Sequence, residues 1–295
     1  MPELPEVETV MRGLAPHLRG RRVIAARLSG KRLRLPWPRD FAARLEGARV
    51  EALSRRAKFM LWRLDSGETV ISHLGMSGRF TVLPGPGGAQ GARALGEFYF
   101  HGPAGDQPGP HDHLVLTLDD QTRVIYTDPR RFGFFDLAAD AAAHPMLAGL
   151  GPEPLGDEFT AAHLARAFHG RRAPVKTVLL DQKVVAGLGN IYVCEALFRA
   201  RVSPRRAAAA LAPTGRPTPR LARLVTAIRE ILREAIRAGG STISDHARVD
   251  GSSGGFQQHF SVYGREGEPC GGCGRPIRRI TQSGRGTFYC PRCQR

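Results

Sequence analysis

Four cysteines in the last part of the chain constrain its fold more than any other feature. They form the pattern C-x2-C-x16-C-x2-C with Cys270, Cys273, Cys290 and Cys293. Two tight CxxC turns can offer four thiolates to one tetrahedral Zn2+, and the sixteen residues between them suit a β-hairpin. Because four protein ligands complete the coordination sphere, this ion is expected to be structural rather than catalytic. Two disulfides are the alternative, which the lack of a secretory segment disfavours.

The chain is strongly basic. Its 295 residues carry 43 Lys or Arg against 27 Asp or Glu, a formal charge of +16. Residues 1–150 contribute +4 and residues 151–295 contribute +12, so the second half is the stronger electrostatic footprint for nucleic acid. A general preference for arginine, which supplies 39 of the 43 cations, does not explain this asymmetry. No long apolar run or signal peptide is visible, so we expect a soluble, cytoplasmic protein with no membrane partner.

Short apolar runs dominate the first half. Residues 5–18 carry apolar side chains at helical spacing and predict a helix. Strand-like runs follow at residues 23–28, 50–53, 59–64, 69–73, 80–83, 114–118 and 123–126. Several antiparallel strands at short spacing indicate a β-sandwich with the first helix packed against it. The Pro- and Gly-rich residues 84–110 are expected to form a mobile loop.

The composition changes near residue 138, where alanine-rich, helix-forming sequence begins. Helices are predicted over residues 160–169, 175–181, 190–199 and 219–237. Together with the first half, these segments predict an α+β protein. We expect a β-sandwich over 2–137, a helical DNA-binding domain over 138–260 and a zinc finger over 261–295. The fifth cysteine, Cys194, lies in an apolar helical stretch and is expected to be a buried core residue.

The first residues place an amine beside a carboxylate. Removal of Met1 before a proline leaves Pro2 with a free secondary amine next to Glu3. An α-amino group has a reference pKa of about 7.7–8.0, so part of it is uncharged at neutral pH and can form a Schiff base. The alternative is structural: Pro2 and Pro5 stiffen the entry to a helix that Glu6 favours electrostatically.

A second anion site is predicted at residues 187–190, which read Gly-Leu-Gly-Asn. Two glycines before an Asn make a tight double turn that exposes backbone N–H groups at a helix start, where phosphate binds readily. A simple turn between helices is the alternative. The nearby cations Arg172, Lys176 and Lys183 favour contact with a DNA backbone.

Seven motifs together resemble the formamidopyrimidine-DNA glycosylases. They are PELPEVET at 2–9, RRAKF at 55–59, HLGMSGR at 73–79, HDH at 111–113, YTDPRRFG at 126–133, GLGNIY at 187–192 and VYGREGEPC at 262–270. With the terminal cysteines they span residues 2 to 293. The resemblance implies an N-terminal antiparallel β-sandwich and a C-terminal helix–two-turn–helix domain with a zinc-finger hairpin. It also implies a bacterial, monomeric repair enzyme for double-stranded DNA containing oxidised bases or abasic sites.

The resemblance assigns the chemistry to four residues. Pro2 attacks the sugar of an oxidised purine nucleotide, such as 8-oxoguanine or a formamidopyrimidine, and β,δ-elimination then cuts the strand. Glu3 serves as general acid and base. Lys58 donates protons for elimination, and a solvated surface lysine is its alternative. Arg285 matches an arginine of the later elimination step, although a guanidinium is a poor acid and phosphate binding is its alternative role.

The resemblance also implies how the base is removed from the helix. Met76, Arg130 and Phe132 match the residues that fill the void left by an extruded base, and Met or Phe can wedge between bases while Arg reads the orphaned partner. Taken alone, Met76 and Phe132 are more typical of a core. His73 and His111 are expected to contact phosphate or the active site, with structural histidines as the alternative.

Three further assignments complete the predicted interface. Asn190 is expected to hold the strand near the lesion, and Glu6 to orient the amine or bind lesion or water unless it is a plain first-turn carboxylate. Arg172 stands where the family pattern has a lysine, so it keeps the charge but changes the geometry. Residues 241–260 correspond to a loop over the extruded base, with a flexible linker as the alternative.

Two other functions compete with this one. An endonuclease VIII-type glycosylase uses the same amine on oxidised pyrimidines, but its chain typically starts PEGPE, whereas residue 4 here is Leu. A zinc-finger protein that detects damage without catalysis has no need of Pro2, Glu3 and Lys58 together.

Overall fold

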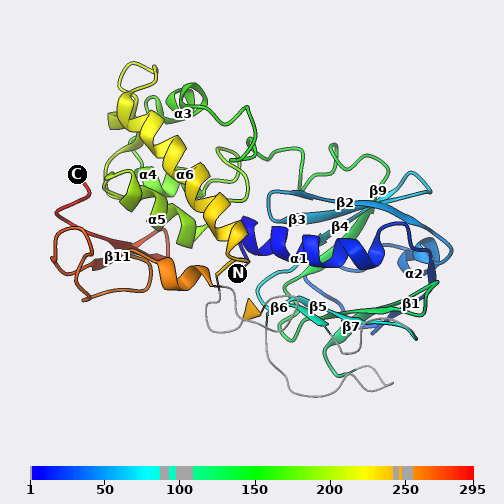
Figure 1. The fold of residues 1–295 in the computed structure, drawn as a ribbon. Coiled ribbons are helices and arrows are strands. Elements are labelled where there is room, and N and C mark those ends of the chain that lie inside the picture. The colour runs from blue at the N-terminus through cyan, green and yellow to red at the C-terminus, as the bar shows by residue number, and fades with distance from the viewer. Residues whose placement is uncertain (1, 87–92, 98–108, 242–245, 248–254) are drawn as a thin grey trace. The chain divides into compact units, whose positions relative to one another are not determined.

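The computed structural model describes residues 2–86, 93–97, 109–241, 246–247 and 255–295 (Figure 1). These residues form two compact units. Unit 1 comprises Met1–Ala148 and Ala238–Gly255, and unit 2 comprises Gly149–Arg237 and Phe256–Arg295. In the described part of the chain, no helix combines the length and the apolar character needed to cross a membrane.

The helices and strands have the following bounds. The helices are α1 Leu4–Leu18, α2 Phe41–Leu45, α3 Ala161–Phe168, α4 Val175–Leu180, α5 Asn190–Arg199 and α6 Pro219–Arg237, with 3-10 turns at Ala208–Leu211 and Phe256–His259. The strands of unit 1 are β1 Val23–Leu28, β2 Val50–Arg56, β3 Phe59–Leu64, β4 Thr69–His73, β5 Arg79–Leu83, β6 Arg93–Glu97, β7 Asp112–Leu118, β8 Arg123–Thr127, β9 Phe134–Ala138 and β10 His246–Ala247. Unit 2 contains β11 Arg278–Gln282 and β12 Arg285–Tyr289.

Unit 1 is a β-sandwich of two antiparallel sheets. One sheet has the strand order β1-β7-β8-β5-β6-β10 and the other has the order β2-β3-β4-β9. Buried aromatic rings join the two sheets: Trp62 of β3 lies 5.8 Å from Phe80 of β5, and Phe135 of β9 meets both rings edge-on. Helix α1 contacts strands of both sheets and runs between them (Figure 1). The predicted sandwich with a packed first helix is therefore confirmed.

Three elements of unit 1 differ from the sequence predictions. The expected loop over 84–110 contains β6, which pairs with β5, while residues 87–92 and 98–108 lie outside the described part. Strand β9 and the short helix α2 were not predicted. Each of these elements is five residues long.

Unit 2 joins helices to the cysteine hairpin. The pairing of β11 with β12 places Arg278 opposite Tyr289 and Gln282 opposite Arg285. Cys194 of α5 is 1 % exposed and shares an apolar cluster with Val262, Ile277 and two of the four motif cysteines, Cys270 and Cys290. The prediction that Cys194 is a core residue is therefore confirmed, and the cluster makes the hairpin part of the packing of α5.

Candidate active site and nucleic-acid interface

The start of α1 is a capping box built around the predicted reactive residues. Glu3 is the N-cap, and the Glu6 carboxylate accepts the Glu3 N–H at 2.9 Å. The other Glu6 oxygen accepts the backbone N–H of Ser241 at 2.9 Å and its hydroxyl at 3.0 Å. Pro2, Glu3 and Glu6 are all buried. Glu6 therefore links the helix start to Ser241 by hydrogen bonds. No local sequence pattern indicated this role.

Lys58 lies in the two-residue turn between β2 and β3. Only 7 % of its surface is exposed, so the alternative of a solvated surface lysine is wrong. The turn is held beside the first half of α1, because Arg55 Nε lies 2.8 Å from Glu8 Oε2 and both side chains are largely buried. Burying an ammonium group is costly, which makes a lysine at this position a candidate for function.

His73 ends β4 directly opposite Phe59, the residue after Lys58. Its Nδ1 accepts the Gly75 N–H at 2.9 Å, so the proton of the neutral ring is on Nε2. The pKa of His73 is lowered to about 4, mainly by burial and to a smaller extent by the positive charges of Lys58 and Arg34. At neutral pH the side chain is therefore an uncharged donor with a defined tautomer, stacked on Phe134.

The pKa of His73 predicts a loss of stability in acid. Because the folded-state pKa of about 4 lies below the ordinary value of 6.5, the unfolded chain takes up a proton first as the pH falls through this window. The stabilisation is present above about pH 6.5 and is lost towards pH 4, amounting to about 3 kcal/mol in the free energy of unfolding. Urea unfolding of the His73→Gln variant between pH 7 and 4 is expected to show a flatter pH dependence than wild type. Substitution of the exposed His259 serves as control, and equal slopes for all three proteins would contradict the expectation.

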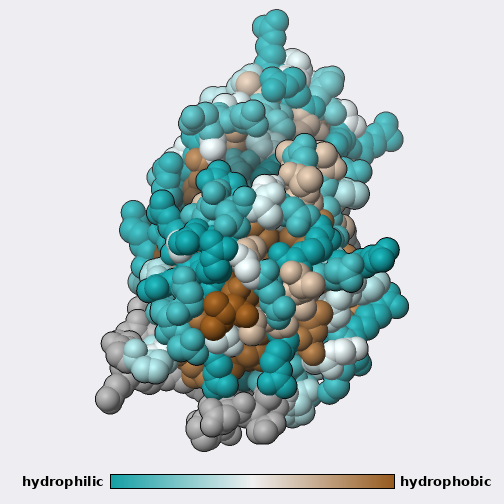
Figure 2. Space-filling model, turned by 90° about the vertical axis from the view of Figure 1, so that its right-hand side faces the viewer, coloured by the Kyte–Doolittle hydropathy of each residue, from teal (hydrophilic) through white to brown (hydrophobic). Residues whose placement is uncertain are grey.

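Two loops of unit 1 carry the predicted void-filling residues. Met76 is half-buried in the loop 74–78, while Arg130 and Phe132 are exposed in the loop 129–133. The Arg130 guanidinium lies 4.7 Å above the Phe132 ring. Phe132 is 44 % exposed and, with Ile24, is one of the exposed large hydrophobic residues of the described chain, so the core alternative for Phe132 is wrong. Hydrophilic side chains cover most of the face drawn in Figure 2, where apolar side chains form only limited patches.

The two outer histidines of the HDH motif differ in burial. His111 is exposed just before β7. His113 is buried, and its ring nitrogens lie 2.9 Å from the Ser29 hydroxyl and 3.0 Å from the Asp128 carbonyl. Of this pair, His111 is therefore the one whose surroundings suit a contact with phosphate, and His113 has a structural role.

In unit 2 the double turn at 187–190 lies against the cysteine hairpin. The Asn190 side chain donates to the Gly286 carbonyl at 3.0 Å, next to the exposed Arg285. Lys176 donates to the same carbonyl at 3.0 Å and to the Thr287 hydroxyl at 2.6 Å. Lys176 is completely buried, so the expectation that it lies on a DNA-facing surface is wrong. It is a structural link between α4 and the hairpin.

Two other predicted features of the interface are less defined. Arg172 is exposed before α4, and its side chain forms no hydrogen bond or ion pair with the described residues. Most of the predicted loop over 241–260 lies outside the described residues. Its described parts are Ser241, β10 and residues 255–260, with a 3-10 turn at Phe256–His259.

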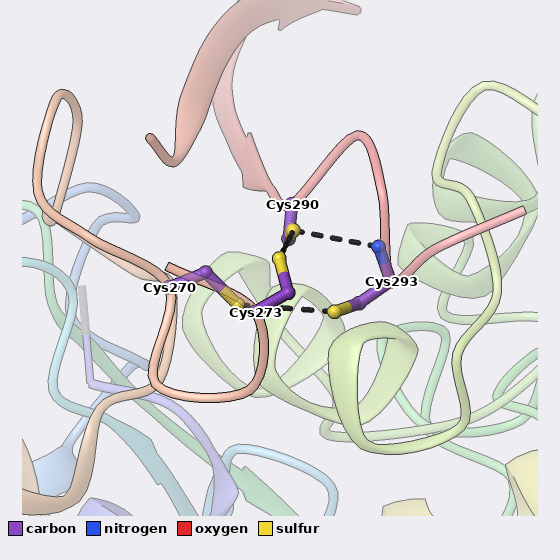
Figure 3. A group of neighbouring side chains, drawn as sticks. All are labelled: Cys270, Cys273, Cys290 and Cys293. Carbon is purple, nitrogen blue, oxygen red and sulfur yellow. Dashed lines mark hydrogen bonds between the residues drawn. The ribbon is translucent and has the colours of Figure 1, made fainter. Parts of the chain in front are cut away.

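The four predicted metal ligands converge at one end of the hairpin (Figure 3). Their sulfur atoms all lie within 4.8 Å of one another, with Cys270 and Cys293 3.9 Å apart and Cys273 and Cys290 3.5 Å apart. These separations are far too long for disulfides and agree with the roughly 3.8 Å between sulfurs around a tetrahedral zinc ion. The disulfide alternative is wrong, and the four thiolates fit one structural Zn2+.

Several residues of these sites were not identified from the sequence. Asp128 and Ser77 join the two void-filling loops, and Ser241 anchors Glu6. Glu195 of α5 accepts the backbone N–H groups of Ser261, Val262 and Tyr263 at 2.7–2.9 Å, which fixes the chain as it enters the zinc finger. Asp128 lies inside the YTDPRRFG motif, but only its hydrogen bonds in the folded structure show what it binds.

Family descriptions match all three parts of the chain. Residues 1–135 match the formamidopyrimidine-DNA glycosylase N-terminal domain, residues 150–247 match the H2TH domain of the same enzymes, and residues 267–295 match a zinc finger found in FPG and IleRS. The fold and the cysteine site define a zinc-finger DNA-repair glycosylase with a helix–two-turn–helix domain. The chain belongs to the formamidopyrimidine-DNA glycosylase family.

Relatives and solved structures agree with this assignment. Formamidopyrimidine-DNA glycosylase of Rhizobium etli (strain CIAT 652) is 52 % identical over 303 residues and covers all of both chains. The enzyme of Methylobacterium sp. (strain 4-46) is 54 % identical, with 100 % of this chain and 99 % of the relative covered. The MutM (Fpg) protein of Thermus thermophilus superposes with a TM-score of 0.80 at 39 % identity, covering 99 % of this chain and 98 % of that one. A Lactococcus lactis Fpg mutant bound to Fapy-dG-containing DNA gives 0.80 at 31 % identity, with 99 % of each chain covered.

Proposed function

We propose that this chain is a bifunctional DNA glycosylase and abasic-site lyase that removes oxidised purines, 8-oxoguanine and formamidopyrimidines, from double-stranded DNA. One observation carries the proposal: a buried helix start containing Pro2 and Glu3 is held beside the turn that buries Lys58. An amine, a carboxylate and an ammonium group on these neighbouring elements suit Schiff-base formation followed by proton transfer.

The chemistry follows from these groups. With Met1 removed, the Pro2 nitrogen forms a bond to the sugar C1′, and the bond between C1′ and the damaged base breaks with its electron pair leaving on the base. Glu3 moves the protons needed at the base and at the sugar ring oxygen as the iminium forms. The iminium makes the C2′ proton acidic, so the 3′ phosphate leaves by β-elimination and the 5′ phosphate by δ-elimination. Lys58 donates protons during these steps.

Extrusion and strand binding are assigned to the remaining predicted residues. Met76 and Phe132 fill the space left by the base, and Arg130 hydrogen-bonds the orphaned partner. Phosphate contacts are assigned to His73, His111, Arg172, Asn190 and Arg285. For Arg285 phosphate binding is favoured over proton donation, because a guanidinium stays protonated and the side chain is exposed beside Gly286. Such contacts position the strand and carry little sequence information.

The proposed division of labour follows the chain. Residues 2–137 supply catalysis, residues 138–260 bind DNA and include the loop 241–260 over the extruded base, and residues 261–295 form the zinc finger. A bacterial cytoplasmic location, at the nucleoid, is proposed because the substrate is chromosomal DNA. The enzyme is proposed to act as a monomer.

Borohydride reduction of the imine tests the proposal directly. Wild-type protein incubated with a duplex containing 8-oxoguanine is expected to become covalently attached to the DNA. Pro2→Gly with a blocked amino terminus is expected to trap none, whereas Pro5→Ala, a change in the same helix turn that leaves the amine intact, is expected to keep trapping. Absence of a wild-type adduct, or undiminished trapping by the blocked variant, would refute the Schiff-base mechanism.

The same assay separates the rival functions. Faster trapping on a duplex containing an oxidised pyrimidine than on 8-oxoguanine would indicate an endonuclease VIII-type activity. Tight binding to damaged DNA with no adduct on either duplex would indicate a damage-binding protein. Leu4 and the exposed Phe132 beside Arg130 favour the purine enzyme.

A further inference from the structure

We propose that Asp128, acting through Ser77 and Tyr126, is a positioning residue that locks the two void-filling loops into one rigid body. This fixed arrangement of the two loops determines how strongly the rate of excision depends on the base opposite the lesion. The inference rests on the proposed function and concerns residues outside the set assigned to chemistry or to DNA contacts.

Asp128 is completely buried and binds both loops at once. Its Oδ1 accepts the hydroxyl of Ser77, in the first loop, at 2.5 Å. Its Oδ2 accepts the backbone N–H of Gly133, at the end of the second loop, at 2.8 Å. The Tyr126 hydroxyl of β8 also donates to Oδ2, at 3.2 Å. A single carboxylate therefore connects each loop to the other and both to the sheet.

A second hydrogen bond extends this connection to the residue that reads the partner base. The Ser77 hydroxyl oxygen accepts the backbone N–H of Arg130 at 3.2 Å. The same hydroxyl donates to Asp128, so its donor and acceptor functions are both used. The backbone position of Arg130 in the second loop is thus fixed by a side chain of the first loop, one residue after Met76.

The loop backbones are packed too closely for either loop to shift independently. A Cβ on Gly75 would lie 2.3 Å from the Gly133 nitrogen and 2.3 Å from the Phe132 carbonyl carbon, and Gly75 has a φ of +66°. A Cβ on Gly133 would lie 1.9 Å from the Tyr126 hydroxyl. Both positions therefore require glycine, and the resulting contact holds the loops at one separation.

Arg130 and Phe132 are the exposed residues of these linked loops, and they are the residues proposed to contact the DNA bases. The Arg130 guanidinium stacks on the exposed Phe132 ring, so a displacement of the loop backbone moves both groups. A well-oriented bidentate contact between Arg and a base discriminates between bases by about fivefold to a hundredfold, and it depends on angle as well as distance. Removing the hydrogen bonds between the two loops should therefore reduce the discrimination between opposite bases more than it reduces the rate of the reaction at Pro2.

The test compares Ser77→Ala with a matched control, Thr127→Val. The Thr127 hydroxyl donates to a carboxylate oxygen of Asp112 at 2.5 Å, the same kind of bond in an adjacent part of the sheet, and Asp112 belongs to neither loop. For each protein, single-turnover excision of 8-oxoguanine is measured opposite all four bases. Cleavage of a single-stranded abasic oligonucleotide is measured in parallel, because that substrate has no base stack to fill.

Ser77→Ala is expected to lower the ratio between the best and the worst opposite base by about tenfold, within the range that one base contact supplies. Its cleavage of the single-stranded abasic substrate and the ratio for Thr127→Val are expected to match wild type. If Ser77→Ala fails to fold, Tyr126→Phe removes one donor to Asp128 without altering either loop and is expected to lower the same ratio.

The outcomes separate the two proposals. Wild-type protein that forms no imine on any substrate overturns the proposed function and this inference together. Active wild type with an unchanged opposite-base ratio in the folded Ser77 and Tyr126 variants overturns the inference alone. Equal losses on duplex and single-stranded substrates also overturn it, because they would show a general structural role.

Discussion

Replacing Glu3 by Gln is expected to separate the two activities of this enzyme. Loss of an intact base requires proton transfer at the base and the sugar, and a positioned general acid or base contributes about 10²- to 10⁴-fold. Excision of 8-oxoguanine by Glu3→Gln should fall by about that factor. Cleavage at a pre-formed abasic site needs no base to leave, so it should stay within about tenfold of wild type. Single-turnover assays on the two duplexes measure both rates.

The structure indicates that Glu3→Gln changes proton transfer without displacing the helix start. The Glu3 side chain takes part in the capping box of α1, and Gln retains an acceptor oxygen for that hydrogen bond. The helix start, and with it Pro2, should therefore keep its position. Glu51→Gln, at an exposed residue of β2, is the control and should leave both rates unchanged. Equal losses of excision and abasic cleavage in Glu3→Gln would show that Glu3 acts on the imine steps rather than on base release.

Removal of the metal is expected to abolish DNA binding. A structural zinc ion contributes about 10–16 kcal/mol of binding free energy, comparable to the roughly 5–15 kcal/mol that stabilises a whole domain. The cysteines share an apolar cluster with Val262 and Cys194, so unfolding of the hairpin also disturbs the packing of α5. Chelation, or Cys290→Ser, should reduce affinity for a lesion duplex by more than about 100-fold in a fluorescence anisotropy titration. The β-sheet circular dichroism of unit 1 should persist.

Cys194→Ala provides the matched control for this experiment. Cys194 is as buried as Cys290 and belongs to the same cluster, but it lies outside the four-sulfur group. Its loss should cost only the modest stability of a small cavity, with zinc content and DNA affinity unchanged. DNA affinity equal to wild type in the metal-free protein would show that the hairpin contributes neither contacts nor order to the interface.

The fold was largely predictable where local patterns are strong. Helices α5 and α6 match their predicted bounds, and most strands of the sandwich were located to within a few residues. Strands β6 and β9 were missed, and each is stabilised by hydrogen bonds from a neighbouring strand, β5 and β4 respectively, that no local pattern shows. A Pro- and Gly-rich composition also concealed β6.

The lysines show where sequence reasoning about the site succeeded and where it failed. Lys58 follows Arg55 and Arg56, and Lys176 lies near Arg172 in the sequence. Each lysine was expected to act on DNA. Both are buried, but Lys176 donates to Gly286 and Thr287 within unit 2, whereas Lys58 lies in the turn of the β2–β3 hairpin beside α1. Only three-dimensional contacts distinguish a structural lysine from a candidate proton donor.

Residue identity and short spacing are enough to specify the zinc ligands and the amine–carboxylate pair of Pro2 and Glu3. Each CxxC turn and the helix start form from neighbours within a few positions, and the sixteen residues between the two CxxC pairs fold back as the hairpin β11–β12. Tertiary structure alone decides which polar groups become partners across the chain. Ser77 meets Asp128 across 51 positions, and Glu6 meets Ser241 across 235. Such pairs have no sequence period, because they arise when separate strands and loops are buried together and each polar group must find a partner.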